Sequence, residues 1–267
     1  VMISFFEIWV SFKYLFPKTR EKFLSLITLF SFLGISLGVA TLIIVMSVMN
    51  GFREELTSKV LGINGHLKIK SINNDGMKRN QNLEKKILKN FDDLKINNVI
   101  LSQGLMTYKG YSSGILIKGV SENFFQDRKI FTNTISKDFI KQFKNNDGVF
   151  IGKKLKKKLR LNQGDYITIL SPKSYETFLG DLPRSANFKV IGFFDVGMYE
   201  YDTSLIFFPI ELLQKFLNYD DKIDHYEVIV TDFQDITLIK DKIKNILPEY
   251  FRTIDWRELN PSLFKYG

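Results

Sequence analysis

The chain has 267 residues, no cysteine, two histidines and a formal net charge of +9. The missing cysteines exclude disulfides, thiolate zinc sites and cysteine nucleophiles, and two histidines far apart in sequence disfavour a histidine metal site. The positive charge is mostly lysine, spread along the sequence rather than gathered in a patch. Such charge suits a membrane surface as well as a nucleic acid, and we expect no nucleic-acid partner.

The longest apolar segment runs from Phe23 to Met49, and the gap between Lys22 and Arg53 carries no charge. At about 1.5 Å per helical residue, this gap exceeds the ~30 Å hydrocarbon core of a bilayer. A buried helix of a soluble protein is one alternative, but such helices rarely lack a polar face over this length. A cleaved signal peptide is another, although its apolar core is about half as long. We predict a transmembrane helix with a short outer extension over residues 23–52.

Residues 1–22 precede this helix and form a separate segment. Apolar side chains recur at helical spacing over residues 3–16, with Trp9 and Tyr14 suited to the headgroup level, before Pro17 ends the pattern. We expect an amphipathic helix in the membrane interface. Lysine and arginine are more frequent before the apolar segment than after it, so the positive-inside rule places the N-terminus in the cytoplasm and the large domain outside.

Two glycines give the apolar segment a small-xxx-small pattern. Gly34 and Gly38 are four residues apart, which would let another helix approach closely. The alternative is that glycine is simply common in membrane helices. We predict that these two positions form a helix-packing surface.

The chain beyond residue 60 has the pattern of an α+β domain. Residues 53–120 are expected to contain a strand (66–71), a polar turn (73–82), a helix (83–91) and two strands joined through residues 110–114 (99–109 and 115–120). Residues 224–258 are expected to contain a strand (225–231), a helix (236–247) and a strand (252–255). We predict that these two parts pack as one split α/β subdomain.

Residues 121–223 are predicted to form an inserted, mostly β subdomain. The expected elements are helices over 136–143, 153–159 and 209–217, and strands over 148–151, 166–170, 188–194 and 204–208. Residues 171–187 lack any period and contain Pro172, Gly180 and Pro183. Because structureless insertions of this length are usually functional or disordered, we expect a protruding loop here.

No catalytic constellation is evident in the sequence. The segment Gly148–Lys154 lacks the spacing of a phosphate-binding loop, and no nucleophile-elbow pattern occurs. The acidic pairs Asp92-Asp93 and Asp220-Asp221 fall in predicted turns, where solvated carboxylates are the simpler interpretation. The basic helix 153–160 could bind acidic lipid or nucleic acid, but a solvated face is the simpler interpretation. We therefore expect a binding or transport role, with no catalytic residue, metal or cofactor in this chain.

Several motifs resemble the permeases of lipoprotein-releasing ABC transporters of the LolC/LolE type. They are GISLGV, SVMNGFREEL followed by LGIN, FKYLFPKTREKFLS, IGKKLKKKLRLNQGD, LPRSANFKVIGFFDVGMYEYD and DWRELNPSLF. The resemblance covers essentially the whole chain. It implies a periplasmic core domain like that of MacB-type transporters. It also implies that residues 259–267 lead into a second membrane helix, so we expect the sequence to be part of a longer chain.

The resemblance implies a function in the inner membrane of a Gram-negative bacterium. Such a permease pairs with a second permease subunit, different or identical, and with a cytoplasmic ATPase dimer that binds ATP and Mg²⁺. It extracts lipoproteins from the membrane and passes them to a periplasmic carrier. Membrane lipids and lipoprotein substrates are therefore expected partners.

The resemblance also suggests two groups of site residues. The wall of a lipid cavity is assigned to apolar side chains near the end of the first membrane helix, with packing against the partner subunit as the alternative: Val45, Met46, Val48, Met49 and Phe52. The carrier-binding loop is assigned to five residues in 171–187, with a flexible lid as the alternative: Tyr175, Phe178, Leu179, Pro183 and Arg184. The sequence matches both permease types of the family, and these two types use the loop region differently.

Three other functions remain open at this point. A MacB-type permease of the same architecture could export a small molecule or peptide, or transmit force. A membrane-anchored sensor would lead to a cytoplasmic signalling domain instead of further membrane helices. An enzyme would need an acidic pair or a histidine in a pocket.

Overall fold

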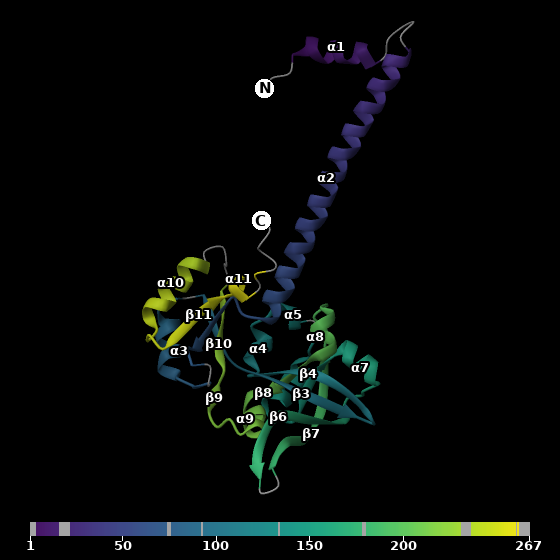
Figure 1. The fold of residues 1–267 in the computed structure, drawn as a ribbon. Helices are drawn as coiled ribbons and strands as arrows, with labels where there is room; N and C mark the ends of the chain where they lie inside the picture. Colours follow the sequence, from purple (N-terminus) through teal and green to yellow (C-terminus); the bar gives the residue numbers. More distant parts are fainter. Residues whose placement is uncertain are drawn as a thin grey trace. The chain divides into compact units, whose positions relative to one another are not determined.

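The computed structural model describes residues 4–15, 22–73, 76–91, 93–132, 134–177, 180–230, 236–259 and 261 (Figure 1). The chain divides into two units, Val1–Leu56 and Thr57–Gly267. The predicted fold class, an apolar N-terminal helix followed by a mixed α/β domain, is confirmed.

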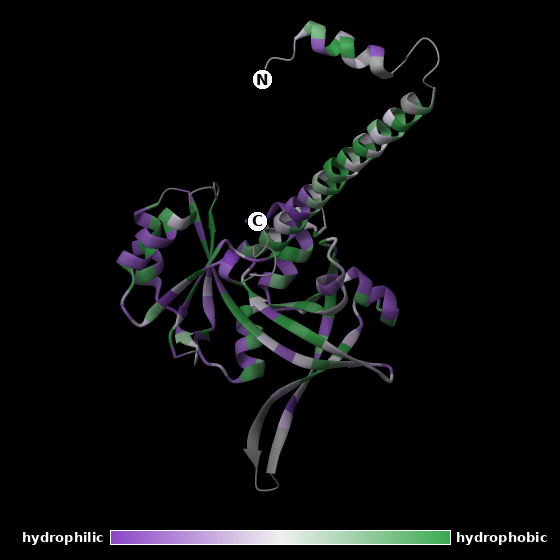
Figure 2. Cartoon of the chain, turned by 45° about the horizontal axis from the view of Figure 1, so that its top comes forward, coloured by the Kyte–Doolittle hydropathy of each residue, from purple (hydrophilic) through white to green (hydrophobic). Residues whose placement is uncertain are grey.

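Two helices occupy the N-terminal unit. Helix α1 spans Phe5–Leu15, as the amphipathic pattern predicts. Helix α2 spans Lys22–Ile63 and continues through Asn50 and Gly51 into the second unit. Its 42 residues extend over about 63 Å, and apolar residues cover most of its first half (Figure 2). By length and composition, this helix could cross a membrane, with a mean hydropathy of 2.4 over the best window of Leu26–Ile63.

A closed barrel forms one half of the second unit. Each strand pairs with the next in the order β3, β4, β8, β5, β7, β6, and β6 pairs back with β3. The strands are β3 (Leu94–Tyr108), β4 (Tyr111–Val120), β5 (Val149–Gly152), β6 (Tyr166–Thr177), β7 (Gly180–Phe194) and β8 (Leu205–Pro209). The barrel removes exposed sheet edges where these strands pair.

Strand β3 also belongs to a second, open sheet. Its first residues pair with β10 (His225–Val230), β10 pairs with β1 (Leu67–Ser71), and β1 pairs with β11 (Phe251–Asp255). Helices α3 (Gln81–Lys89) and α10 (Ile236–Ile246) bury their apolar residues against one face of this sheet (Figure 1). Since β1 lies between β10 and β11, residues from both predicted parts of the split subdomain share one sheet.

Short elements complete the second unit. They are β2 (Met77–Lys78), β9 (Lys222–Ile223), α4 (Asn123–Gln126), α5 (Lys129–Thr132), α6 (Lys137–Lys144), α7 (Lys153–Leu159), α8 (Tyr199–Ser204), α9 (Ile210–Leu217) and α11 (Trp256–Leu259). Helix α6 begins where the Ser136 side chain accepts a hydrogen bond from the backbone N–H of Phe139. Phenylalanines of α4, α5, α6, β5 and β8 form a buried cluster. The ring centroid of Phe125 lies 5.0–5.3 Å from the ring centroids of Phe131, Phe143, Phe150 and Phe207.

The prediction of a structureless loop over 171–187 is wrong. Strands β6 and β7 continue as a hairpin, with Ser171 opposite Arg184 and Thr177 opposite Gly180. The paired strands of this hairpin extend away from the barrel at the lower end of the domain (Figure 1). Residues 171–187 have no alternating apolar pattern, and such a pattern is the signal by which a strand is predicted from sequence.

Two other connections differ from prediction. The expected turn over 73–82 contains β2, which pairs with β9. The expected linker 110–114 is mostly strand, because a tight turn at Lys109 and Gly110 joins β3 to β4 directly. Both residues have positive φ, 45° and 83°, as a two-residue hairpin turn requires. The predicted boundaries at residues 120 and 223 stay predictions, and β4 pairs with β8 across the first of them.

Candidate functional site

The predicted cavity residues lie on α2 with their side chains exposed. Val45, Val48, Met49 and Phe52, here called the α2 stripe, have the spacing i, i+3, i+4 and i+7, which places them on one helix face. Met46 is also exposed and flanks this stripe, three residues before Met49. The structure therefore brings four of the five predicted residues onto one continuous apolar surface.

The two glycines lie on that same face. Gly38 precedes Val45 by seven residues, and Gly34 precedes it by eleven, each close to a whole number of helical turns. A Cβ atom added at either glycine would meet nothing within 4 Å. The predicted helix-packing surface and the predicted lipid wall are thus successive parts of one face of α2, and their roles stay predictions.

The predicted carrier-binding residues belong to the β6–β7 hairpin. Tyr175 pairs with Leu182 in the backbone register, Pro183 is exposed and Arg184 is half-buried. Phe178 and Leu179 lie outside the described residues.

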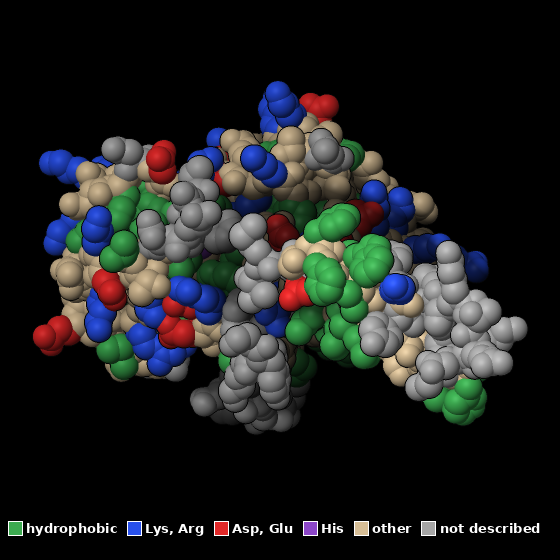
Figure 3. Space-filling model, turned by 90° about the horizontal axis from the view of Figure 1, so that it is seen from above, with side chains coloured by type: hydrophobic (Ala, Val, Ile, Leu, Met, Phe, Trp, Pro, Cys, Tyr) green, Lys and Arg blue, Asp and Glu red, His purple; other side chains and the backbone are tan. Residues whose placement is uncertain are grey.

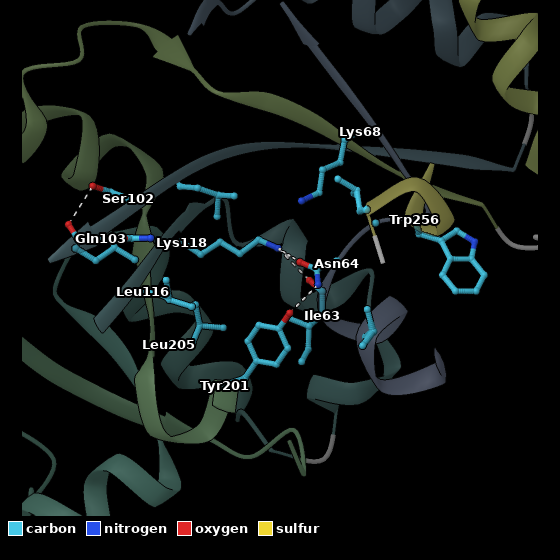
Figure 4. Close-up of a pocket in the computed structure, with 15 residues that line it drawn as sticks. Ile63, Asn64, Lys68, Ser102, Gln103, Leu116, Lys118, Tyr201, Leu205 and Trp256 are labelled. Atoms are coloured by element: carbon cyan, nitrogen blue, oxygen red, sulfur yellow. Dashed lines mark hydrogen bonds between the residues drawn. The ribbon is translucent and has the colours of Figure 1, made fainter. Parts of the chain in front are cut away.

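A pocket of about 430 Å³ lies within the second unit, where the open sheet meets the barrel (Figure 4). We call it the junction pocket. Its walls come from the last turn of α2 and from β1, β3, β4, α8, β8 and α11. Lys68, Asn64 and Tyr201 contribute polar groups, whereas Leu101, Leu116, Leu205 and Trp256 contribute apolar surface.

A buried lysine fastens the end of α2 to β4 beside this pocket. The Lys118 ammonium donates hydrogen bonds to the backbone oxygen of Ile63 (3.0 Å), to Oδ1 of Asn64 (3.3 Å) and to Oε1 of Glu227 (2.8 Å). Asn64 Nδ2 in turn donates to the hydroxyl oxygen of Tyr201 at 3.0 Å (Figure 4). Lys118 therefore satisfies a backbone oxygen at the C-terminal end of the helix, where carbonyl groups lack intrahelical partners.

The same carboxylate holds a second buried cation. Arg128 Nη2 donates to Oε2 of Glu227 at 2.8 Å, and Nη1 donates to the backbone oxygen of Phe124 at 3.2 Å. The Phe124 ring lies 3.5 Å from the guanidinium carbon of Arg128 and 4.8 Å from Nζ of Lys118. His225 Nε2 lies 3.5 Å from Oε1 of Glu227. Lys118, Arg128, Glu227 and His225 are the buried charge cluster.

Burial and charge act in opposite directions in this cluster. Burial lowers the pKa of Lys118 to about 8 and the pKa of Arg128 to about 10, although Glu227 opposes both shifts. Burial alone would raise the pKa of Glu227, but Lys118, His225 and Arg128 outweigh it and hold that pKa well below its usual range. Burial also lowers the pKa of His225, so its ring is neutral near pH 7.

Sequence reasoning did not find the buried charge cluster. Lys118 and Glu227 each interrupt an otherwise apolar strand, GILIKGV and HYEVIV, and a charged residue at such a position is the available signal. The pairing itself could not be inferred, because the partners are 109 residues apart.

Lysine and arginine side chains are spread over the face seen from above, with aspartate and glutamate among them (Figure 3). The distribution of charge on this face agrees with the interpretation of the positive charge as a compositional bias.

Within the described residues, no group of three or more His, Cys, Asp or Glu side chains could hold a metal ion.

A protein-family model matches most of the chain. Residues 28–246 match the model of the MacB-like periplasmic core domain family. The chain belongs to this family.

Comparison with individual proteins shows which members of the family the chain is similar to. The chain is 27% identical to the lipoprotein-releasing system transmembrane protein LolC of Neisseria meningitidis serogroup B, over 97% of this chain and 63% of that protein. It is 28% identical to the LolE protein of Haemophilus influenzae, over 84% of this chain and 55% of that protein. The predicted resemblance to LolC/LolE permeases is thereby confirmed, and the chain spans about half to two-thirds of these relatives' length.

The periplasmic region of MacB from Actinobacillus actinomycetemcomitans aligns with a TM-score of 0.49 at 13% identity. The alignment covers 78% of this chain and 97% of that structure.

Proposed function

We propose that this chain belongs to the permease subunit of an ABC transporter that releases lipoproteins from the inner membrane. The similarity to LolC along 97% of the chain carries this proposal, because that relative is named for lipoprotein release. The long apolar helix α2 supports it, since a permease must cross the membrane. In this proposal the N-terminus is cytoplasmic and residues 53–258 are periplasmic.

The physical task is to keep acyl chains away from water. Exposing each methylene costs ~0.8 kcal/mol, so a lipoprotein with several acyl chains does not leave a bilayer unaided. The α2 stripe, with Met46 beside it, supplies exposed apolar side chains at the end of the uncharged segment. We assign it to the wall of the cavity that receives the acyl chains, where methionine adapts to chains of different shape.

The remaining components lie outside this chain. A second permease subunit packs on the Gly34 and Gly38 part of the α2 face, where small residues allow close approach. A cytoplasmic ATPase dimer binds ATP and Mg²⁺ and drives extraction. The periplasmic carrier takes the lipoprotein at the β6–β7 hairpin, whose Pro183 is exposed.

Membership in the MacB-like family favours one alternative function. A permease of this architecture could instead export a small molecule or peptide, or transmit force across the membrane. It would then contact partner proteins at the tip of its folded domain without holding acyl chains against α2. The two functions differ in what lies beside the α2 stripe during transport.

Photo-crosslinking at the α2 stripe tests the proposal. A photoreactive amino acid is placed at Met49, or at Leu37 as an exposed control nearer the start of α2, in the native transporter in membranes. We expect Met49 to form an adduct with a radiolabelled triacylated lipoprotein that ATP addition depletes, and Leu37 to form much less. Equal labelling at both positions, or labelling by lipids alone, would contradict a substrate wall at the stripe.

A further inference from the structure

The described lining of the junction pocket carries two lysines, of which Lys118 is paired with Glu227 behind the pocket wall. Lys68 and Lys118 both line it, and the described residues that line it include no aspartate or glutamate. Lys68 is half-buried on β1, directly opposite Glu227 of β10 in the strand register. It lies near enough to Lys118 and His225 to lower the pKa of both. The pocket therefore exposes one cation beside the buried charge cluster.

The buried charge cluster does not neutralise itself. Lys118 and Arg128 share one carboxylate, Glu227, which leaves an excess of one positive charge when His225 is neutral, and Lys68, opposite Glu227 in the strand register, adds a second. Two further carboxylates lie nearby: Asp127 raises the pKa of Arg128 but pairs with Lys95 at 2.9 Å, and Asp255 pairs with Lys240 at 3.4 Å. An excess of charge at a partly dry site favours a bound counter-ion, because Coulomb interactions strengthen as the dielectric falls.

A row of exposed leucines leads out of the pocket along the barrel, with the exposed Gln103 between Leu101 and Leu105 on the same face of β3. Leu101 and Leu116 line the pocket and are 47% and 40% exposed, and Leu105, four residues further along β3, is 42% exposed. In the register of β3 and β4, Leu101 lies opposite Lys118, and Leu105 lies opposite Gly114, which has no side chain to cover the row. At about 3.4 Å per residue, the row from Leu101 to Leu105 is about 14 Å long.

We propose that the junction pocket binds an anionic amphiphile, with its negatively charged head group beside Lys68 and its hydrocarbon chain along Leu101, Leu116 and Leu105. The pocket volume of about 430 Å³ is in the ordinary range for small-molecule sites. A free fatty acid and an acidic phospholipid share this chemistry. The site lies in the second unit and is separate from the α2 stripe, so it does not depend on the proposed lipoprotein cavity.

A ligand in the junction pocket would lie beside the last turn of α2 and its hydrogen bonds to Lys118. Ile63 and Asn64 line the pocket and also accept hydrogen bonds from Lys118. An anion beside Lys68 would favour the charged form of Lys118 and so strengthen both bonds. Occupancy of the pocket would therefore tighten the attachment of the end of α2 to β4.

The test uses the full chain in nanodiscs of phosphatidylcholine, which has no net charge. One sample receives diazirine-labelled palmitate, a second receives the matching uncharged diazirine alcohol, and a third contains diazirine-labelled phosphatidylglycerol in the disc. After irradiation, labelled peptides are mapped by mass spectrometry. We expect palmitate or phosphatidylglycerol to label peptides containing Leu101, Leu105 or Leu116, at least fivefold more than the alcohol does. If palmitate labels these peptides, the amphiphile is a free fatty acid. If phosphatidylglycerol labels them, it is an acidic phospholipid of the membrane.

Two variants and one control make the outcome decisive. Lys68→Gln removes the exposed cation and Leu105→Asn interrupts the apolar row, and each should reduce labelling at least fivefold. Lys70→Gln, on the same strand but outside the pocket lining, should leave labelling unchanged. No labelling at the pocket, equal labelling by the alcohol, or equal loss in Lys70→Gln would overturn the proposal. Circular dichroism of each variant confirms that the fold is retained, and Leu105→Asn still tests the site if Lys68→Gln unfolds.

Discussion

Glu227 is the carboxylate at the centre of the buried charge cluster. It is fully buried and accepts hydrogen bonds from two buried cations, each at 2.8 Å. Breaking a buried pair from one side is costly because the remaining charge stays buried without compensation. Substituting Glu227 would leave both Lys118 and Arg128 buried without a counter-charge.

We therefore expect Glu227→Gln to reduce the free energy of unfolding by ~3–5 kcal/mol. Urea denaturation of the full chain in a neutral detergent, followed by tryptophan fluorescence, measures this change. Glu84→Gln is the matched control, because Glu84 pairs with Arg79, whose side chain is 42% exposed, and should cost less than ~1 kcal/mol. Similar losses in the two variants would show that the cluster does not stabilise the fold.

His66 gives stability a dependence on pH. It is buried at the start of the open sheet, and its Nδ1 accepts a hydrogen bond from the backbone N–H of Val230 at 3.1 Å. Burial, assisted by Arg128, lowers its pKa to about 4. The unfolded chain binds a proton at His66 near pH 6.5, but the folded chain does so only near pH 4, so stability falls as pH decreases through this window.

We expect His66 to account for up to ~3 kcal/mol of stability lost between pH 7 and pH 4. The His66→Asn variant keeps a side-chain acceptor but does not titrate, so its unfolding free energy should decrease less over the same range. Urea midpoints measured at half-unit pH steps give the difference between the two proteins. If the curves of the two proteins stay parallel, His66 does not titrate on unfolding.

At the scale of single elements, the sequence predicted those helices and strands whose one-sided burial gives them a regular apolar pattern. Helix α10 and strand β1 were found because each has one buried face and therefore a clear period. The outer part of the β6–β7 hairpin was missed because its backbone pairing does not require alternating apolar residues. Helix α4 was missed because its four residues are too short to show a helical period, although Phe124 and Phe125 anchor it in the core.

The β6–β7 hairpin carries a prediction of its own. If it captures the periplasmic carrier, the combined variant Phe178→Ala, Leu179→Ala and Arg184→Ala should weaken carrier binding at least tenfold, because interface anchors each contribute ~2 kcal/mol or more. Binding of the purified carrier to the full chain in nanodiscs, measured by biolayer interferometry, tests this. Tyr111→Ala is the control, because Tyr111 is 66% exposed at the start of β4, beside the turn of the other hairpin. Equal affinity of all three proteins would exclude the β6–β7 hairpin as the carrier site.

At the scale of the whole molecule, local patterns and long-range contacts differ in how far they can be predicted. The apolar length of α2 and the motifs of the resemblance were sufficient to predict the class, which the family match confirms. The candidate cavity residues on α2 came from the resemblance, and the helix places four of them on one face. The junction pocket could not be predicted, because it combines residues from positions as distant as Val60 and Leu259, and no local pattern records which strands become neighbours.

The function proposed for the whole molecule assigns α2, the β6–β7 hairpin and the partner proteins to successive steps of one transport cycle. We propose that acyl chains leave the membrane against the α2 stripe, that ATP hydrolysis by the partner supplies the energy, and that the carrier receives the lipoprotein. Each step depends on the lipoprotein being the transported molecule.

ATP-driven lipoprotein release is therefore the most direct measurement. The native transporter is reconstituted into proteoliposomes with a radiolabelled triacylated lipoprotein, and the label transferred to soluble carrier is counted with and without ATP. The proposal predicts transfer that requires both ATP and carrier, and that falls at least tenfold when Val48 and Phe52 are both changed to Asn. If the lipoprotein stays in the membrane while the transporter hydrolyses ATP, the chain does not function in lipoprotein release.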